Sequence, residues 1–114
     1  MDNCIFCKII AGELPGKVVY EDPMVVAVED IDPQAPHHYL IFPRKHLPTT
    51  LDLTEGDDQL VGHVFRVAAK LARDHGFAER GFRVVNNCNE GAGQSVWHIH
   101  FHLLGGRDLS WPPG

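Results

Sequence analysis

Segment 97–104 alternates large apolar residues with histidines, and this pattern constrains the fold more than any other part of the chain. Side chains of a β-strand point to opposite faces in turn, so the three histidines would form one row with neighbours roughly 7 Å apart. The row consists of His98, His100 and His102. The opposite face consists of Trp97, Ile99, Phe101 and Leu103. We therefore predict a last strand over residues 97–104 that buries its apolar face and presents imidazoles on the other.

Histidine is not among the residues that strands prefer, so the row needs an explanation, and three are open. A solvated face is the simplest, although Lys, Glu or Thr would serve it as well. A metal site is the second, because alternate strand histidines can bind zinc. A catalytic row is the third, since imidazole suits nucleophilic and acid–base work near neutral pH. The preceding Gly-Ala-Gly-Gln-Ser at 91–95 favours catalysis, because successive backbone N–H groups of a glycine turn can bind a phosphate.

The rest of the chain predicts a small α+β domain. Runs rich in β-branched residues predict strands over residues 17–20, 24–28, 38–42 and 82–85, the first two joined as a hairpin. Apolar residues at 5, 6, 9 and 10 predict a short helix, and a wide apolar face predicts a long helix over residues 54–75 with Thr54 as its N-cap. The length fits one domain, residues 1–114. We expect a mostly antiparallel five-stranded sheet with both helices packed on one side.

Composition narrows the classes of partner. The net charge is −5 with neutral histidines, which argues against a broad basic surface for DNA or RNA. No segment approaches the roughly 20 apolar residues of a membrane span, and no secretory signal is recognisable, so we expect no membrane partner. The cysteine count is three, an odd number, which without such a signal favours a reducing compartment and a cytoplasmic protein.

Cys4-x-x-Cys7 has the spacing of a zinc hairpin or of a redox pair. A redox pair suits a thioredoxin-like context, which this chain lacks. A closed zinc site needs four ligands, two more than the cysteines supply. Two buried free thiols remain the alternative.

Several motifs together resemble the Hint branch of the histidine triad (HIT) superfamily. The strand motif His-Ile-His-Phe-His-Leu-Leu at 98–104 has its three histidines separated by apolar residues and followed by two more. The resemblance extends to Asp-Pro-Gln-Ala-Pro-His-His at 32–38, Pro-Arg-Lys-His at 43–46, Gly-Gln-Ser-Val at 93–96, Gly-Gly-Arg at 105–107 and Trp-Pro-Pro-Gly at 111–114. It therefore covers nearly the whole chain.

The resemblance implies a function as well as a fold. Hint proteins are homodimeric purine nucleoside phosphoramidases, which hydrolyse adenosine 5′-phosphoramidates at the P–N bond, and also aminoacyl-adenylates, with no metal needed for the chemistry. The resemblance thus implies an AMP-type purine nucleotide as substrate, and a HIT-like fold whose sheet continues across a homodimer. A dinucleoside polyphosphate hydrolase or nucleotidyltransferase of the same superfamily is the first alternative. A non-catalytic nucleotide-binding scaffold is the second.

The resemblance also implies roles for individual residues. His100 would be the nucleophile that forms a nucleotidyl-histidine, oriented by the backbone carbonyl of His98. His102 would contact the phosphate, His38 would support proton relay, and Ser95 would contact the leaving group, although Ser95 could merely cap its loop. The expected substrate-binding residues are Asp30, Asn87, Gly93, Gln94, Ile5, Phe6, Ile9, Leu14, Ile31 and Trp111.

Some of these assignments leave a choice open. Asn86 stands beside Asn87, so the asparagine that meets the phosphate is ambiguous. Asp30 matches the carboxylate that accepts the ribose hydroxyls, but it could equally be a surface acid. Some HIT proteins that carry the same cysteine pair bind structural zinc, and the corresponding ligands here are Cys4, Cys7, His46 and His98.

Overall fold

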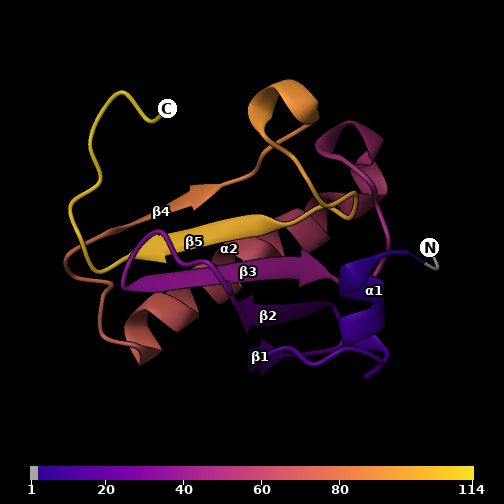
Figure 1. Ribbon diagram of the computed structural model, residues 1–114, viewed down its shortest axis with the longest axis horizontal. Helices are drawn as coiled ribbons and strands as arrows, with labels where there is room; N and C mark the ends of the chain where they lie inside the picture. Colours follow the sequence, from indigo (N-terminus) through magenta and orange to yellow (C-terminus); the bar gives the residue numbers. More distant parts are fainter. Residues whose placement is uncertain (1–2) are drawn as a thin grey trace.

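The computed structural model describes residues 3–114 and shows an antiparallel sheet of five strands in the order β1-β2-β3-β5-β4 (Figure 1). The strands are β1 (Val18–Glu21), β2 (Val25–Glu29), β3 (His37–Pro43), β4 (Phe82–Val85) and β5 (Phe101–Gly105). The helices are α1 (Ile5–Ile10) and α2 (Asp58–Asp74), with 3-10 turns η1 (Thr50–Asp52), η2 (Glu55–Asp57) and η3 (Glu90–Ala92). The predicted α+β class, with one long and one short helix, is confirmed.

The two helices lie on opposite faces of the sheet, so the prediction that both pack on one side is wrong. Val25 and Ala27 of β2 belong to the core beneath α2, which lies behind the sheet in Figure 1. Val26 and Val28 of the same strand pack instead with Phe6 of α1. A strand buried on both faces is apolar without alternation, and that pattern does not tell which helix covers which side.

The hairpin between β1 and β2 is fixed by the carboxylate of Asp22. Its Oδ1 atom accepts hydrogen bonds from the backbone N–H groups of Met24 and Val25, at 2.7 and 2.9 Å. Its Oδ2 atom accepts from the Tyr20 hydroxyl at 2.7 Å and lies 2.6 Å from Nε2 of His63 on α2. Although burial opposes it, these hydrogen bonds hold the pKa of Asp22 well below its usual range. The turn is therefore tied to the long helix as well as closed.

Helix α2 begins later than the predicted start at residue 54, because Thr54 caps the 3-10 turn η2 and Asp57 stands at the N-cap of α2 itself. The Thr54 backbone N–H donates to the Asp57 carboxylate at 3.0 Å in a capping box, and α2 proper starts at Asp58. Its buried residues are Val64, Val67, Ala68, Leu71 and Ala72, whereas the apolar residue Phe65 is 51% exposed. Within residues 3–114, no helix has both the length and the apolar character needed to cross a membrane.

Strand β5 begins at Phe101, later than the predicted start at residue 97. The backbone before it does not join the ladder, because the N–H of Ile99 donates to the carbonyl of Leu47 in the loop after β3, at 2.6 Å. Ile99 is still buried, but Trp97 is 47% exposed, so its predicted place in the core is wrong. The departure from strand geometry before β5 turns this indole toward solvent.

Candidate active site

The histidine row lies on the sheet face that carries α1. His102 pairs in register with Leu40 of β3, a residue packed in the cluster around Phe6. The Phe6 ring also contacts the rings of both His98 and His100, with centroids 5.7 and 5.1 Å away. The common face of the three histidines therefore survives although the strand starts late.

A cavity of about 780 Å³ opens beside this row. The predicted site residues in its wall are Ile5, Phe6, Ile9, Asp30, Ile31, Asn87, Gly93, Ser95, His100 and His102. A volume of this size suits a nucleotide-sized ligand, and its lining combines apolar side chains with a few convergent polar groups. The residues expected from scattered parts of the sequence thus meet at one site.

His100 is held in one tautomer by the main chain. Its Nδ1 atom lies 2.8 Å from the carbonyl oxygen of His98, and because a carbonyl only accepts, Nδ1 must carry the hydrogen. Among residues 3–114, no buried side-chain nitrogen or oxygen lacks a partner, so Nε2, for which none is found, must reach the cavity. Burial also lowers the pKa of His100. The ring is a neutral imidazole with its Nε2 lone pair open to a ligand.

His38 and His102 form a pair of hydrogen-bonded imidazoles. The proton position on His38 determines the proton position on His102. The backbone N–H of Gln34 donates to Nδ1 of His38 at 3.0 Å, so the hydrogen of His38 is on Nε2. That atom lies 2.8 Å from Nδ1 of His102, which must accept, and 3.3 Å from the Asp30 carboxylate. The neutral His102 ring therefore carries its hydrogen on Nε2.

Burial keeps this pair neutral. It lowers the pKa of His102 to about 4 and lowers the pKa of His38 as well, although the negative charge of Asp30 opposes both shifts. The donor atoms of Asp30, His38 and His102 lie close enough together to hold a cation. The hydrogen bonds between them account for the arrangement without one. His102 therefore offers the cavity a hydrogen-bond donor beside the His100 lone pair.

The loop before β5 contributes fewer anion-binding groups than predicted. The N–H groups of Gly93 and Gln94 are used by the turn itself, donating to Glu90 and Asn89 at 2.9 and 3.1 Å. The Gln94 side chain is buried and ties the loop to the carbonyls of Pro48 and Val96, so it does not line the cavity. Among the described residues, the Ser95 N–H has no hydrogen-bond acceptor. Ser95 is thus the loop residue positioned to meet a ligand with both N–H and hydroxyl.

The adjacent asparagines have different surroundings. Asn86 donates from Nδ2 to the carbonyl of His100 at 2.9 Å and accepts from the Thr50 hydroxyl. Asn87 lies in the cavity wall. The structure therefore leaves Asn87 available to a ligand and gives Asn86 the task of holding the His100 backbone.

Besides Gln94, two predicted substrate-binding residues are outside the cavity wall. Leu14 is 39% exposed and Trp111 is 81% exposed, and neither lines the cavity. Val28 and Leu40, which sequence reasoning missed, are in its wall instead. Their signal was available in principle, because alternate residues of neighbouring strands share one face of a sheet.

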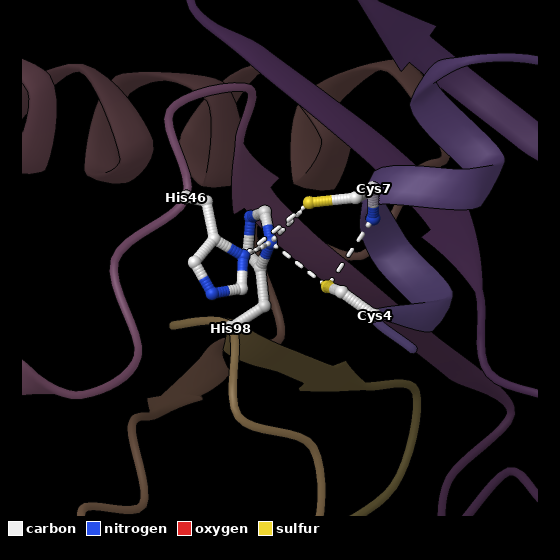
Figure 2. Close-up of side chains that lie close together, drawn as sticks. All are labelled: Cys4, Cys7, His46 and His98. Carbon is white, nitrogen blue, oxygen red and sulfur yellow. Dashed lines mark hydrogen bonds between the residues drawn. The ribbon is translucent and has the colours of Figure 1, made fainter. Parts of the chain in front are cut away.

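Cys4, Cys7, His46 and His98 form a compact cluster at the N-terminal end of α1 (Figure 2). Nδ1 of His98 lies 3.3 Å from Sγ of Cys4, 3.6 Å from Sγ of Cys7 and 3.1 Å from Nδ1 of His46. Sγ of Cys7 lies 3.3 Å from Nδ1 of His46. A tetrahedral zinc site with Zn–S of about 2.3 Å and Zn–N of about 2.0 Å has its ligand atoms roughly 3.3–3.8 Å apart. The cluster comes close to this spacing.

The protonation of His98 also fits a metal ligand. Its Nε2 atom lies 2.7 Å from the carbonyl of Pro43 and so carries the hydrogen, which leaves the Nδ1 lone pair facing the sulfurs. Burial lowers the pKa of His98 to about 4, so the ring is neutral, and burial raises the pKa of the Cys7 thiol. Without a cation this shift keeps the proton on the Cys7 thiol, whereas a divalent cation would balance the charge of a thiolate ligand. The donor set and its surroundings therefore suit zinc.

Comparison with known proteins agrees with this geometry. The family model of the HIT domain matches residues 11–109. The chain is 48% identical over 108 residues to a purine nucleoside phosphoramidase of Escherichia coli (strain K12), covering 95% of this chain and 91% of the relative. The crystal structure of a HIT family hydrolase from Legionella pneumophila superposes with a TM-score of 0.96 at 52% identity, covering 98% of this chain and all of that one. A histidine triad protein from Clostridium difficile gives 0.92 at 45% identity, covering 96% and 95%.

Proposed function

The chain belongs to the HIT domain family, and from that premise we propose that it hydrolyses the P–N bond of purine nucleoside 5′-phosphoramidates and, by the same attack at phosphorus, the P–O bond to the acyl group of aminoacyl-adenylates. A HIT family hydrolase shares its fold at 52% identity. The observation that carries the proposal is the neutral His100 ring, with Nδ1 fixed on a carbonyl and Nε2 open to a nucleotide-sized cavity. The purine preference rests on the E. coli relative, because an apolar slot does not select a base by itself.

The reaction proceeds in two displacements at phosphorus. Nε2 of His100 donates its lone pair to phosphorus, the P–N bond breaks, and the leaving nitrogen takes up a proton to depart as the amine. Water then attacks the nucleotidyl-histidine, the bond from phosphorus to Nε2 breaks, and a nucleoside monophosphate leaves with the oxygen. A neutral imidazole suits the first step, because it meets an anionic phosphoramidate without charge repulsion.

The surrounding residues would stabilise the charge on the phosphoryl oxygens and protonate the leaving amine. The Nε2–H of His102 would donate to a phosphoryl oxygen, as would the N–H of Ser95 and the amide of Asn87; one such donor typically contributes on the order of 3 kcal/mol to the transition state. Ser95 would pass a proton to the leaving amine. His38, bonded to His102, would connect that ring to the Asp30 carboxylate.

Asp30 and the apolar wall would hold the nucleoside. The Asp30 carboxylate lies at the rim of the cavity, where one oxygen accepts the N–H of Asp32 and the other faces His38. It retains acceptor capacity for the two ribose hydroxyls. Ile5, Phe6 and Ile9 of α1 form one side of the slot for the base.

The decisive experiment traps the intermediate. Incubation with an adenosine 5′-phosphoramidate, followed by rapid denaturation and intact mass measurement, is expected to show the added mass of one adenylyl group, located at His100 by peptide mapping. His100→Ala should show neither the adduct nor product, while His98 and His102 remain as internal controls. Adduct on another residue, or turnover by His100→Ala, would refute the mechanism. Faster turnover of diadenosine polyphosphates than of the phosphoramidate would favour the polyphosphate hydrolase alternative.

We also propose that Cys4, Cys7, His46 and His98 bind a structural zinc ion. A closed set of four protein ligands is typical of structural zinc, which holds chain segments together. Its support is the ligand spacing and the free Nδ1 of His98. Zinc content measured by mass spectrometry should approach one per chain and be lost in Cys4→Ser.

A homodimer whose sheet continues through β4 completes the proposal. β4 is an outermost strand of the sheet, and Phe82 on it and Phe65 on α2 are exposed by 39% and 51%. Open strand edges with exposed apolar side chains mark interaction surfaces. Light scattering on a sizing column should give twice the 12.7 kDa chain mass, and Phe65→Glu should shift it to the single-chain value.

A further inference from the structure

A second cavity, of about 510 Å³, adjoins the candidate active site. Its wall shares Ile5, Ser95 and Val96 with the larger cavity, and the remaining lining residues are Asn3, Cys4, His46 and Trp97. Ser95 therefore borders both cavities. The larger cavity, which is lined by His100 and Asp30, is the proposed binding site of the nucleotide. No part of the substrate has yet been assigned to the smaller one.

Trp97 is the largest side chain in the wall of this second cavity. The residue is 47% exposed, because the backbone before β5 leaves the strand path. An indole that is neither buried nor paired in a core offers a flat apolar surface to a ligand. Ile5 and Val96 add aliphatic surface on the side shared with the active site.

The polar groups of this wall disfavour a cationic ligand. Among residues 3–114, no residue that lines this cavity is a carboxylate, so the described part of the wall offers no partner to a positive charge. His46 points Nδ1 at the sulfur of Cys7, and Figure 2 shows its other ring nitrogen turned away from the cysteines. The cavity thus suits an uncharged substituent with apolar surface.

We propose that this second cavity is the subsite for the leaving amine, with Trp97 as the residue that sets specificity for flat apolar substituents. The inference rests on the proposed function and deepens it. Ser95, the residue proposed to protonate the leaving nitrogen, stands where the two cavities meet, so a substituent on that nitrogen enters the second cavity as the nucleotide occupies the first. A leaving group bearing an aromatic ring stacks on Trp97, and one bearing a second ammonium group finds no partner.

Turnover of matched substrates tests the subsite. The probes are adenosine 5′-phosphoramidates of ammonia, 2-phenylethylamine and 1,5-diaminopentane, each compared by kcat/KM. The wild type is expected to prefer the phenylethyl compound to the diaminopentyl compound. In Trp97→Ala the ratio of kcat/KM for the phenylethyl compound to that for the unsubstituted compound should fall roughly tenfold, the equivalent of about 1.4 kcal/mol. Trp97→Phe, which keeps an aromatic surface, should retain most of the ratio.

Leu51→Ala is the matched control, because Leu51 is 77% exposed and lines neither cavity. It should leave the ratio unchanged. An equal loss for all three compounds in Trp97→Ala, or a ratio that does not move, overturns the subsite while leaving the proposed function intact.

A binding measurement separates the subsite from the reaction. In a His100→Ala background, calorimetry with the phenylethyl compound and with AMP should show that adding Trp97→Ala weakens binding of the first roughly tenfold and of the second little. This result supports the subsite even if the wild type cleaves no phosphoramidate, an outcome that would refute only the proposed reaction. Equal weakening of the binding of both ligands overturns the proposed subsite.

Discussion

At the residue scale, main-chain groups set the proton positions on the rings of the site. The carbonyl of His98 fixes the hydrogen of His100 on Nδ1, and the N–H of Gln34 fixes that of His38 on Nε2. His102 follows, because its Nδ1 faces a donor. Backbone groups keep their charge and direction through the reaction, so the rings enter it already oriented.

The path of the backbone at His100 depends in turn on Asn86. Asn86→Asp keeps an acceptor for the Thr50 hydroxyl but removes the donor to the His100 carbonyl. We expect this variant to lose about 1–2 kcal/mol of unfolding free energy, measured by urea denaturation, together with a fall in kcat. Thr50→Val removes only the other hydrogen bond and should leave kcat near the wild-type value. Wild-type stability and kcat in Asn86→Asp would contradict this role.

Gly105 is the glycine at which size matters most. A Cβ added there would overlap the ring of Phe77, which is itself buried at 3% exposure. Gly105→Ala is therefore expected to lose about 2 kcal/mol or more, since neither the strand nor the ring can move freely. Gly62→Ala is the control: it lies exposed in α2 with nothing near its added Cβ, and should gain about 1 kcal/mol. Equal thermal stability of the two variants would refute the steric argument.

The sequence predicted the chemistry-bearing residues better than their surroundings. Alternation brought out His98, His100 and His102, the Cys-x-x-Cys spacing brought out the two cysteines, and the motif resemblance added His46 and Asp30. It could not separate Asn86 from Asn87, because two adjacent turn residues look alike until their hydrogen bonds are known. Nor could it tell that Leu14 and Trp111 are outside the cavity wall. Those positions depend on how the loop after α1 and the last residues of the chain are placed, and neither has a periodic pattern.

At the scale of elements, α1 depends on its tertiary contacts. A helix of six residues is far too short to be stable alone. It is attached by Phe6, which stacks on Phe42 of β3 with ring centroids 4.2 Å apart, and by the cysteines beside His46 and His98. Because α1 forms one wall of the larger cavity, its attachment and ligand binding are connected.

Removal of the proposed zinc ion is therefore expected to loosen α1 selectively. A chelator should lower the thermal midpoint of the wild-type protein by several degrees and speed amide exchange in α1 more than in α2. Cys4→Ser should already show that exchange pattern and respond little to the chelator. Equal chelator effects on both proteins, or none on the wild type, would mean that the cluster does not hold the helix through a metal.

Element boundaries were predictable where a local signal exists. The strand at 82–85 agrees with the structure, and Thr54 does cap a helical turn, although that turn is η2 and not the start of α2, since a β-branched run and a capping residue are local features. The late start of β5 was not predictable, because it results from the hydrogen bond of Ile99 to Leu47, far away in sequence. The placement of α1 and α2 on opposite faces has the same non-local origin.

At the scale of the whole molecule, neutral buried imidazoles make stability sensitive to acid. An unfolded histidine takes up a proton near pH 6.5, whereas burial lowers the pKa of His102 to about 4. The unfolded chain thus binds more protons between these values, so this contribution to the unfolding free energy is complete above pH 6.5 and is lost as the pH falls toward 4.

Urea denaturation at pH 7 and pH 5 measures this loss. For His102 it should amount to about 1 kcal/mol once the partial access of solvent to the ring is allowed for. His102→Gln cannot titrate and should lose correspondingly less between the two pH values, while the cysteine cluster affects both proteins alike. The same loss in both proteins would show that other groups govern the acid response.

The side chain and the backbone carbonyl of His98 have separate roles. Its ring reaches the cysteines and the end of β3, whereas its carbonyl alone serves His100. Phosphoryl transfer therefore places no demand on the identity of this side chain, only on the course of the main chain beneath it. In a chain that gave up the cysteine pair, the imidazole at this position could be exchanged for any group that still donates to the Pro43 oxygen, and the nucleophile would keep its tautomer.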